Sequence, residues 1–453
     1  QKLYTVRADD AGMWRTSLRT PVAGGPYSIS LSDGEELMIR DVLIGEVWLC
    51  AGQSNMEMPL MGKANQPIAD AVDMIVRAKP SRPIRICTIG QAGARKPQKD
   101  CRAQWLKNTP EEVSEASATA YFFADYLQKV LDVPVGIIVS SWGGTAIQAW
   151  MSREVLAPFK AFDLRFLDDT TSIERPKYKP CMLYNAMIAP VEQYTIKGFL
   201  WYQGESNRKD PDLYRRLQPA FVKMLREAWG QGELPFYYVQ IAPFAYEGAE
   251  LVGSALLREA QLLNLKEIPN SNMVVTMDIG DRNCIHPARK RKVGERLALL
   301  ALSGSYGLKG FVPDTPVYQS MEVANGKAYL AFDCGSEGLA PLGATISGVE
   351  VAGSDRDRHE THLQREHRAE RARARGVCAH RRMARPVWAP CSRGVRTLPA
   401  PTNQIRFHRR ACGRAQAQRR GDEGAVGSRI AVPRLMSLLG EMEEREGVFE
   451  VRR

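Results

Sequence analysis

Residues 47–56 read Val47-Trp48-Leu49-Cys50-Ala51-Gly52-Gln53-Ser54-Asn55-Met56. The first four residues are a continuous apolar run, which is typical of a short strand buried on both faces. The polar residues that follow place Ser54 on a turn between this strand and a helix. A helix N-terminus favours developing negative charge, so Ser54 is a candidate nucleophile. The alternative is a serine that only caps the helix.

The strand–polar loop–helix pattern repeats along the chain. Further short apolar runs predict strands at Ile84–Thr88, Val135–Ser140, Gly198–Tyr202, Phe236–Gln240 and Met273–Met277. Amphipathic spacing predicts helices at Ala116–Leu131, Leu213–Trp229 and Pro287–Ser303, the last with proline in its first turn. Alternating units of this size predict an α/β fold, with a parallel sheet covered by helices and a ligand site at the carboxyl ends of its strands.

Strand patterns of a different kind flank this region. Residues 1–45 alternate in polarity around the turn residues Asp33-Gly34, and the pair Asn325-Gly326 separates two alternating runs. Both patterns predict hairpins. The chain begins at Gln1 without an initiator methionine or signal peptide, from which we expect a fragment that starts inside a domain.

Charge divides the chain sharply near residue 350. The last 103 residues hold 23 arginines, no lysine and 12 acidic residues, and therefore the whole net charge of +11. Residues 1–350 hold 39 basic and 39 acidic residues, and His286 is their only histidine. Residues 355–385 have almost no large apolar side chains and no period, so we expect them not to bury enough surface to order.

Three interpretations of the arginine-rich tail remain open. The first is an arm that binds nucleic acid, the second is a solvated extension without a role, and the third is the product of a reading-frame shift. The absence of lysine beside 23 arginines favours the frame shift, because an arm selected for charge alone uses both residues. Nucleic acid is therefore not an expected partner.

Composition excludes several classes of protein. No run of about 18 apolar residues occurs, so we expect no membrane-spanning helix. Nine cysteines in 453 residues are too few for a disulfide-built scaffold, and no CxxC pair suggests a structural zinc site.

Three more polar clusters follow predicted strands. Ser141–Thr145 contains a Gly-Gly pair that lets a backbone N–H approach a ligand, although a plain tight turn is the alternative. Trp201–Asn207 offers Gln203 as an oxyanion donor and two aromatic rings as a sugar-stacking wall, or simply a polar loop. Asp278–Pro287 contains His286, the natural general base near neutral pH.

Together the clusters supply a serine, a base and oxyanion donors at one edge of one sheet. This combination is typical of acyl transfer through a serine nucleophile. It is far more specific than any one of its parts.

The residues Val47–Pro59 closely resemble the nucleophile block of sialate O-acetylesterases, within the wider SGNH/GDSL-type hydrolases. Trp142–Trp150, Trp201–Asn207 and Ile285–Gly294 resemble the later blocks in the same order. The resemblance covers about residues 1–354. It implies a flavodoxin-like α/β domain joined to β-sandwich regions, and removal of O-acetyl groups from sialic acid or related sugars without a metal or organic cofactor.

The resemblance divides the chain into four parts. We expect a partial β-sandwich segment at 1–45, an SGNH-type esterase domain at 46–305, a truncated β segment at 306–354 and a disordered or non-native tail at 355–453. Missing C-terminal strands would expose apolar edges, so we expect a chain less stable than its intact relatives and inactive in this form.

The resemblance also implies roles for single residues. Ser54 is the nucleophile and His286 the general base and acid. The backbone N–H groups of Ser54 and Gly144, with the Gln203 side chain, form the oxyanion hole.

The third member of a catalytic triad is open. Many SGNH enzymes have an aspartate three residues before the histidine, where this chain has Asn283. Asp281, Glu205 or a backbone carbonyl orients His286, or the enzyme uses a Ser–His dyad. Cys284 is a rival nucleophile, disfavoured because no oxyanion-forming turn surrounds it.

The sequence leaves two rival functions open. One is an acetyl xylan esterase with the same chemistry, and another is a carbohydrate-binding protein with a vestigial site. We expect an acetylated carbohydrate as the partner and no membrane. Relatives are usually exported, and neither the compartment nor the oligomeric state follows from the sequence.

Overall fold

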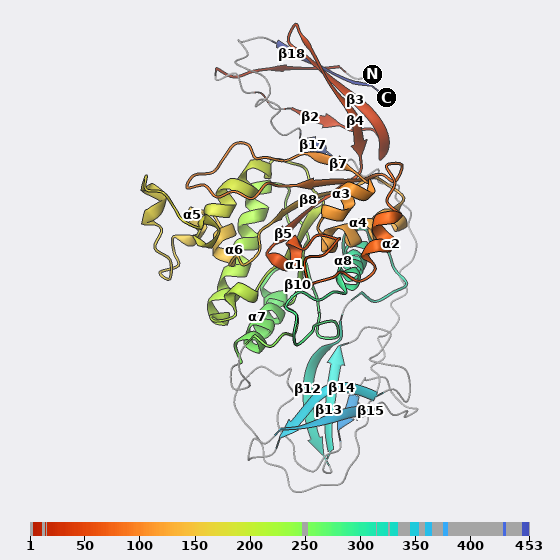
Figure 1. Ribbon diagram of the computed structural model, residues 1–453, viewed down its shortest axis with the longest axis vertical. Coiled ribbons are helices and arrows are strands. Elements are labelled where there is room, and N and C mark those ends of the chain that lie inside the picture. Colours follow the sequence, from red (N-terminus) through yellow and green to blue (C-terminus); the bar gives the residue numbers. More distant parts are fainter. Residues whose placement is uncertain are drawn as a thin grey trace, which may run out of the picture. The chain divides into compact units, whose positions relative to one another are not determined.

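A computed structural model of the chain describes residues 3–10, 14, 16–246, 252–313, 315–324, 327–333, 345–352, 358–364, 375–378, 429–431 and 446–452. The chain forms two compact units (Figure 1). One comprises residues 1–308 with 424–453, and the other comprises residues 309–423.

The first unit opens with the strands β1 to β5, and helices are interspersed among the strands that follow. The strands are β1 (Leu3–Arg7), β2 (Ser17–Arg19), β3 (Gly24–Ser32), β4 (Glu36–Ile44), β5 (Glu46–Gly52), β6 (Ile84–Thr88), β7 (Trp105–Lys107), β8 (Val135–Ser141), β9 (Gly198–Tyr202), β10 (Phe236–Val239) and β11 (Ser271–Val274). The helices are α1 (Ser54–Glu57), α2 (Ala71–Val76), α3 (Pro110–Glu115), α4 (Ala118–Leu131), α5 (Arg153–Leu156), α6 (Pro211–Trp229), α7 (Gly253–Glu267) and α8 (Lys290–Gly304).

A seven-stranded sheet with β5 near its centre organises this unit. The strand order is β11-β10-β9-β5-β8-β6-β7, and every neighbouring pair is parallel except β6 with β7. β5 pairs with β8 on one side and β9 on the other, so the chain changes direction across the sheet at β5. A reversal of this kind opens a crevice at the carboxyl ends of the strands. The structure confirms the predicted α/β class.

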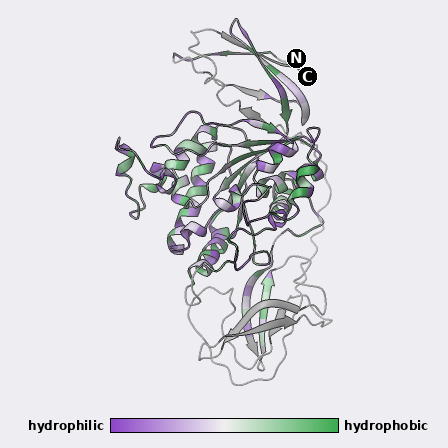
Figure 2. Cartoon of the chain, viewed as in Figure 1, coloured by the Kyte–Doolittle hydropathy of each residue, from purple (hydrophilic) through white to green (hydrophobic). Residues whose placement is uncertain are grey.

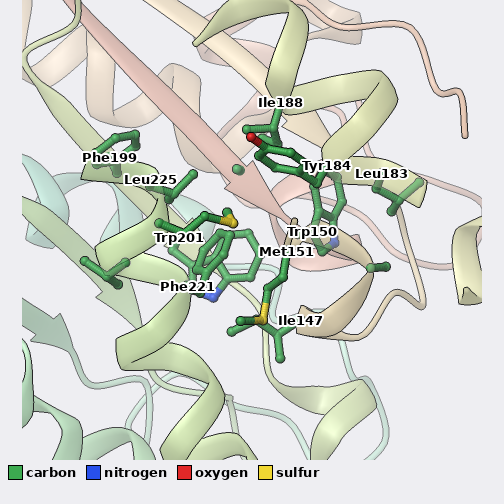
Figure 3. Close-up of a cluster of buried hydrophobic side chains, with 14 of the residues drawn as sticks. Ile147, Trp150, Met151, Leu183, Tyr184, Ile188, Phe199, Trp201, Phe221 and Leu225 are labelled. Carbon is green, nitrogen blue, oxygen red and sulfur yellow. The ribbon is translucent and has the colours of Figure 1, made fainter. Parts of the chain in front are cut away.

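The two faces of the sheet pack against different helices. Trp48 of β5 meets Phe123 of α4 edge to face, with ring centroids 5.2 Å apart. On the opposite face, Trp201 of β9 lies 4.6 Å from Phe221 of α6, within the apolar cluster of Figure 3. Figure 2 shows hydrophilic and hydrophobic residues alternating along α6, as expected for a helix with one buried face.

The helix ends follow local capping rules. α4 begins after Ser117, whose hydroxyl accepts the N–H of Ala120, and α6 has Pro211 in its first turn and Gly230 at its C-terminus. Several predicted boundaries differ from those of the structure, and two of the differences are large. α8 begins at Lys290 rather than at Pro287, and β11 ends at Val274.

Antiparallel sheets lie outside this parallel sheet. In the first unit β18 (Glu446–Arg452) pairs with both β1 and β3, and β3 pairs with β4 around the predicted Asp33-Gly34 turn. β17 (Arg429–Ala431) pairs with β2. None of the helices in the described ranges has the length and apolar character needed to cross a bilayer.

The second unit holds one antiparallel sheet. Its order is β12 (Val317–Ala324), β13 (Lys327–Asp333), β16 (Arg375–Cys378), β15 (Arg358–Gln364) and β14 (Thr345–Ala352). β12 and β13 pair as the predicted hairpin, whose turn residues 325–326 lie outside the described residues. Most of residues 355–453 also lies outside them, so the predictions for the tail stay predictions.

Candidate active site

The register of three strands brings three predicted clusters together. Gly52, the last residue of β5, is the register partner of Ser141 on β8 and of Tyr202 on β9. The chain therefore leaves all three strands at the same level. Gln53 N–H donates to Tyr202 O at 3.0 Å, and Trp142 N–H donates to Gly52 O at 3.1 Å, which extends the sheet into the loops.

Gly52 sets the approach of Ser54 to the sheet. Its φ is +150°, and a Cβ at this position would lie 2.2 Å from the carbonyl oxygen of Tyr202. Only glycine fits there, because a side chain would overlap the neighbouring backbone. The chain then turns directly into α1, which begins at Ser54.

Ser54 lies against the Gly-Gly turn that follows β8. A Cβ built on Gly143 would be 3.3 Å from Cβ of Ser54. Among the described residues, the backbone N–H groups of Ser54 and Gly144 have no hydrogen-bond acceptor. Two unpaired N–H groups beside a serine are the donors that an oxyanion needs.

Two charged side chains hold Gly143 from both sides. Glu57 Oε2 accepts the Gly143 N–H, and Lys177 Nζ donates to the Gly143 carbonyl at 2.9 Å. The C=O and the following N–H of a trans peptide point in opposite directions. The bond to Lys177 therefore turns the N–H of Gly144 away from the lysine and leaves it unpaired.

His286 is hydrogen-bonded to a residue that the sequence did not suggest. Its Nδ1 is 2.6 Å from Oε1 of Gln66. Burial lowers the pKa of His286 to about 4, with the positive charges of Lys290 and Lys63 acting in the same direction and the negative charge of Glu57 opposing them. The imidazole is therefore neutral near pH 7 and able to accept a proton.

Several contacts join the serine and histidine segments, although no hydrogen bond links the Ser54 hydroxyl to the His286 ring. Asn55 Nδ2 donates to the Ile285 carbonyl at 3.2 Å, which ties the residue after Ser54 to the residue before His286. Glu57 is the shared neighbour, because it bonds Gly143 and acts on His286. Catalytic hydrogen bonds often tighten only when substrate binds.

A fully buried polar network lies beneath Ser54. Asn55 Nδ2 donates to Glu205 Oε1 at 2.6 Å, and Lys290 Nζ donates to Asn55 Oδ1. Lys290 and Asn55 are 0% exposed and Glu205 is 2% exposed. Burial lowers the pKa of Lys290 to about 7 and raises the pKa of Glu205.

Neither of the two acids considered for orienting His286 hydrogen-bonds to its ring. Asp281 Oδ1 accepts the N–H of Asn283 within its own turn, and Glu205 bonds Asn55. Cys284, the rival nucleophile, donates from Sγ to the backbone carbonyl of His286 at 3.2 Å.

The Gln203 side chain has a structural role. It is fully buried, and its Nε2 donates to Gln53 Oε1, Thr145 O and Asn207 Oδ1 at 2.8–3.1 Å. These bonds join the three loops, and a role for Gln203 in an oxyanion hole stays a prediction.

The predicted sugar-stacking wall is wrong, because Trp201 is 1% exposed and Tyr202 is fully buried. The aromatic rings beside the Gly-Gly turn are those of Trp142 and Tyr178, with Lys177 Nζ 5.8 Å and 5.1 Å from their centroids. Tyr178 is 52% exposed.

Comparisons with known proteins identify the family of the chain. Residues 44–303 match the family described as carbohydrate esterase, sialic acid-specific acetylesterase. The chain belongs to this family.

Relatives of the sialic acid-specific acetylesterase family resemble much of the chain. The sialate O-acetylesterase of Homo sapiens is 32% identical over 362 residues, which cover 73% of this chain and 67% of the relative. The sialate O-acetylesterase of Mus musculus is 28% identical over 394 residues, covering 73% and 71%. A crystal structure of a carbohydrate acetylesterase from Xanthomonas citri is 35% identical, with a TM-score of 0.69 over 80% of this chain and 81% of that one. The family predicted from the sequence is confirmed.

The sequence did not point to four residues that the structure brings into the site. Glu57 stands in the quoted nucleophile block but has no catalytic signature of its own. Lys177 and Gln66 lie in loops without a motif, and Lys290 lies in a basic stretch that looks solvent-exposed. Only the three-dimensional structure brings them to Ser54.

Proposed function

We propose that the protein removes O-acetyl groups from sialic acid or a related acetylated sugar, with Ser54 as nucleophile and His286 as general base and acid. One observation carries the proposal. Ser54 stands at the carboxyl edge of the sheet beside two unpaired N–H groups, in a loop cluster that also holds a neutral imidazole. Membership of the esterase family supports the same chemistry.

The reaction proceeds in two halves. The Ser54 hydroxyl attacks the acetyl carbonyl carbon while its proton passes to Nε2 of His286, and the carbonyl oxygen becomes an oxyanion bound by the N–H groups of Ser54 and Gly144. The ester bond to the sugar breaks, and the sugar oxygen takes the proton from His286. Water then attacks the acetyl-enzyme with His286 as base, which releases acetate and restores Ser54.

The experiment that tests the mechanism is the Ser54→Ala variant of the full chain, assayed on O-acetylated sialic acid and on p-nitrophenyl acetate. We expect kcat to fall by at least about 10⁴-fold on both esters, because the nucleophile is lost. The matched control is Ser172→Ala, a change at an exposed loop serine. Unchanged hydrolysis by Ser54→Ala would exclude the serine mechanism.

The substrate is tested separately on the unmodified protein. Acetylated sialic acid and acetylated xylan are compared at equal ester concentration, and we expect a higher kcat/KM for the sialic acid. A preference for xylan would assign the protein as an acetyl xylan esterase, and binding of either sugar without acetate release would indicate a carbohydrate-binding protein.

A further inference from the structure

His286 is held by an amide where a serine hydrolase usually has a carboxylate. Its Nδ1 lies 2.6 Å from Gln66 Oε1, and this is the ring's hydrogen bond within the described part of the chain. Two backbone hydrogen bonds to Lys63 hold Gln66 in place. Gln66 N–H donates to Lys63 O at 2.9 Å, and Lys63 N–H donates to Gln66 O at 3.1 Å, which closes a tight loop after α1.

The chemistry of this contact decides where the imidazole carries its proton. With the amide oxygen of Gln66 facing the ring, this hydrogen bond forms when Nδ1 bears the hydrogen, because an amide oxygen accepts hydrogen bonds and does not donate them. Nε2 is then left with its lone pair, which is the state that a base needs to take the proton of a serine hydroxyl.

We propose that Gln66 is the positioning residue that fixes the tautomer and ring orientation of His286, in the place of the triad carboxylate. The inference rests on the proposed function of His286 as base. It adds that the third member of the catalytic set is neutral and comes from the loop after α1, far in sequence from Asp281.

The charges around His286 fit a neutral partner. Lys63 after α1 and Lys290 of α8 disfavour the imidazolium, and Glu57 of α1 favours it. None of the three hydrogen-bonds to the ring, so Gln66 sets its orientation while these charges set its pKa. An amide at Nδ1 adds no negative charge, and the pKa of His286 accordingly stays low, at about 4.

Two substitutions at Gln66 separate orientation from structure. Gln66→Leu removes the acceptor, and we expect kcat to fall about tenfold with little change in KM, the effect of one lost hydrogen bond. Gln66→Glu keeps an acceptor and adds a charge. We expect it to retain kcat near neutral pH and to move the acid limb of kcat/KM upward by about one to three pH units.

Gln104→Leu makes the same change at an exposed glutamine and should alter neither kcat nor the pH profile. If Gln66→Leu keeps the kcat of the unmodified protein, or if Gln66→Glu leaves the acid limb in place, Gln66 does not position His286.

A nitrogen-15 NMR spectrum of the histidine ring nitrogens tests the inference without any ester. The His286 signals are assigned by their loss in His286→Ala. We expect the Nδ1–H tautomer in the unmodified protein and a gain of the Nε2–H tautomer in Gln66→Leu. An Nε2–H tautomer in the unmodified protein overturns the inference even if the esterase is active. The expected tautomers in a protein without esterase activity would instead refute the proposed function alone.

Discussion

Two sets of polar groups surround Ser54, and they differ in burial and in what they touch. Glu57 and Lys177, here called the rim pair, are partly exposed and bind the backbone of Gly143. Asn55, Glu205 and Lys290, the buried trio, are at most 2% exposed and bind mainly one another. The rim pair holds the peptide that carries the proposed oxyanion donor of Gly144, and the buried trio joins the serine segment to the histidine segment.

This difference separates activity from stability. A charge in partial contact with water loses little when its partner is removed, whereas a buried polar group left unpaired costs its full desolvation. Substitutions in the rim pair should therefore change catalysis with little effect on folding. Substitutions in the buried trio should change both.

The largest effect is expected from Asn55→Ala. The change leaves the Lys290 amino group, the Glu205 carboxyl group and the Ile285 carbonyl without their hydrogen bonds to Asn55. We expect the free energy of unfolding to fall by about 3–5 kcal/mol, measured by urea denaturation at pH 7.

Asn283→Ala is the control for this measurement, because Asn283 is exposed and its side chain makes no hydrogen bond within the described residues. Its effect should stay within about 0.5 kcal/mol. Equal stabilities for the two variants would contradict the distinction between the buried trio and the surface.

A smaller effect is expected from Lys177→Met in the rim pair. Without the bond to the Gly143 carbonyl, the Gly144 N–H is no longer held in place. We expect kcat to fall about tenfold, less than the ~10²–10³ of a lost oxyanion donor, and stability to change by less than about 1 kcal/mol. Lys160→Met, at an exposed lysine, is the matched control. If the free energy of unfolding falls by more than the transition-state stabilisation calculated from kcat/KM, Lys177 acts mainly on folding and its assignment to the rim pair is contradicted.

The smallest effect is expected from Glu57→Gln and concerns pH. His286 must be neutral to act as base, so kcat/KM should stay level from neutral pH down to about 5 and fall as the pH passes through about 4. Glutamine can still accept the Gly143 N–H, but the charge that favours the imidazolium is gone. The acid limb of the kcat/KM profile should therefore move to lower pH, by up to about one pH unit. An upward shift would show that Glu57 does not act on His286.

The sequence predicts the parts of the site that follow strands. The apolar runs locate β5, β8 and β9, and the rule for parallel sheets then brings Ser54, Gly144 and Gln203 to one edge. His286 stands out because it is the sole histidine in residues 1–350. These inferences need only local patterns and one topological rule.

The remaining features depend on side-chain contacts between distant loops. The sequence separates Gln66 from His286 by 220 positions and Asn55 from Lys290 by 235. Propensity and period describe neighbours along the chain, so they say nothing of such pairs. The predicted start of α8 at Pro287 was also wrong. Pro287 precedes the helix, which begins at Lys290.

The missing side chain at Gly52 has a mechanical consequence. Because the backbones of β5 and β9 meet there without an intervening side chain, Ser54, the proposed nucleophile, follows directly from the central strand of the sheet. His286, Gln66 and Lys177 instead stand on connecting segments that can be remodelled without disturbing the sheet. Exchange of these segments would therefore change the surroundings of Ser54 while the serine itself stays anchored to the sheet.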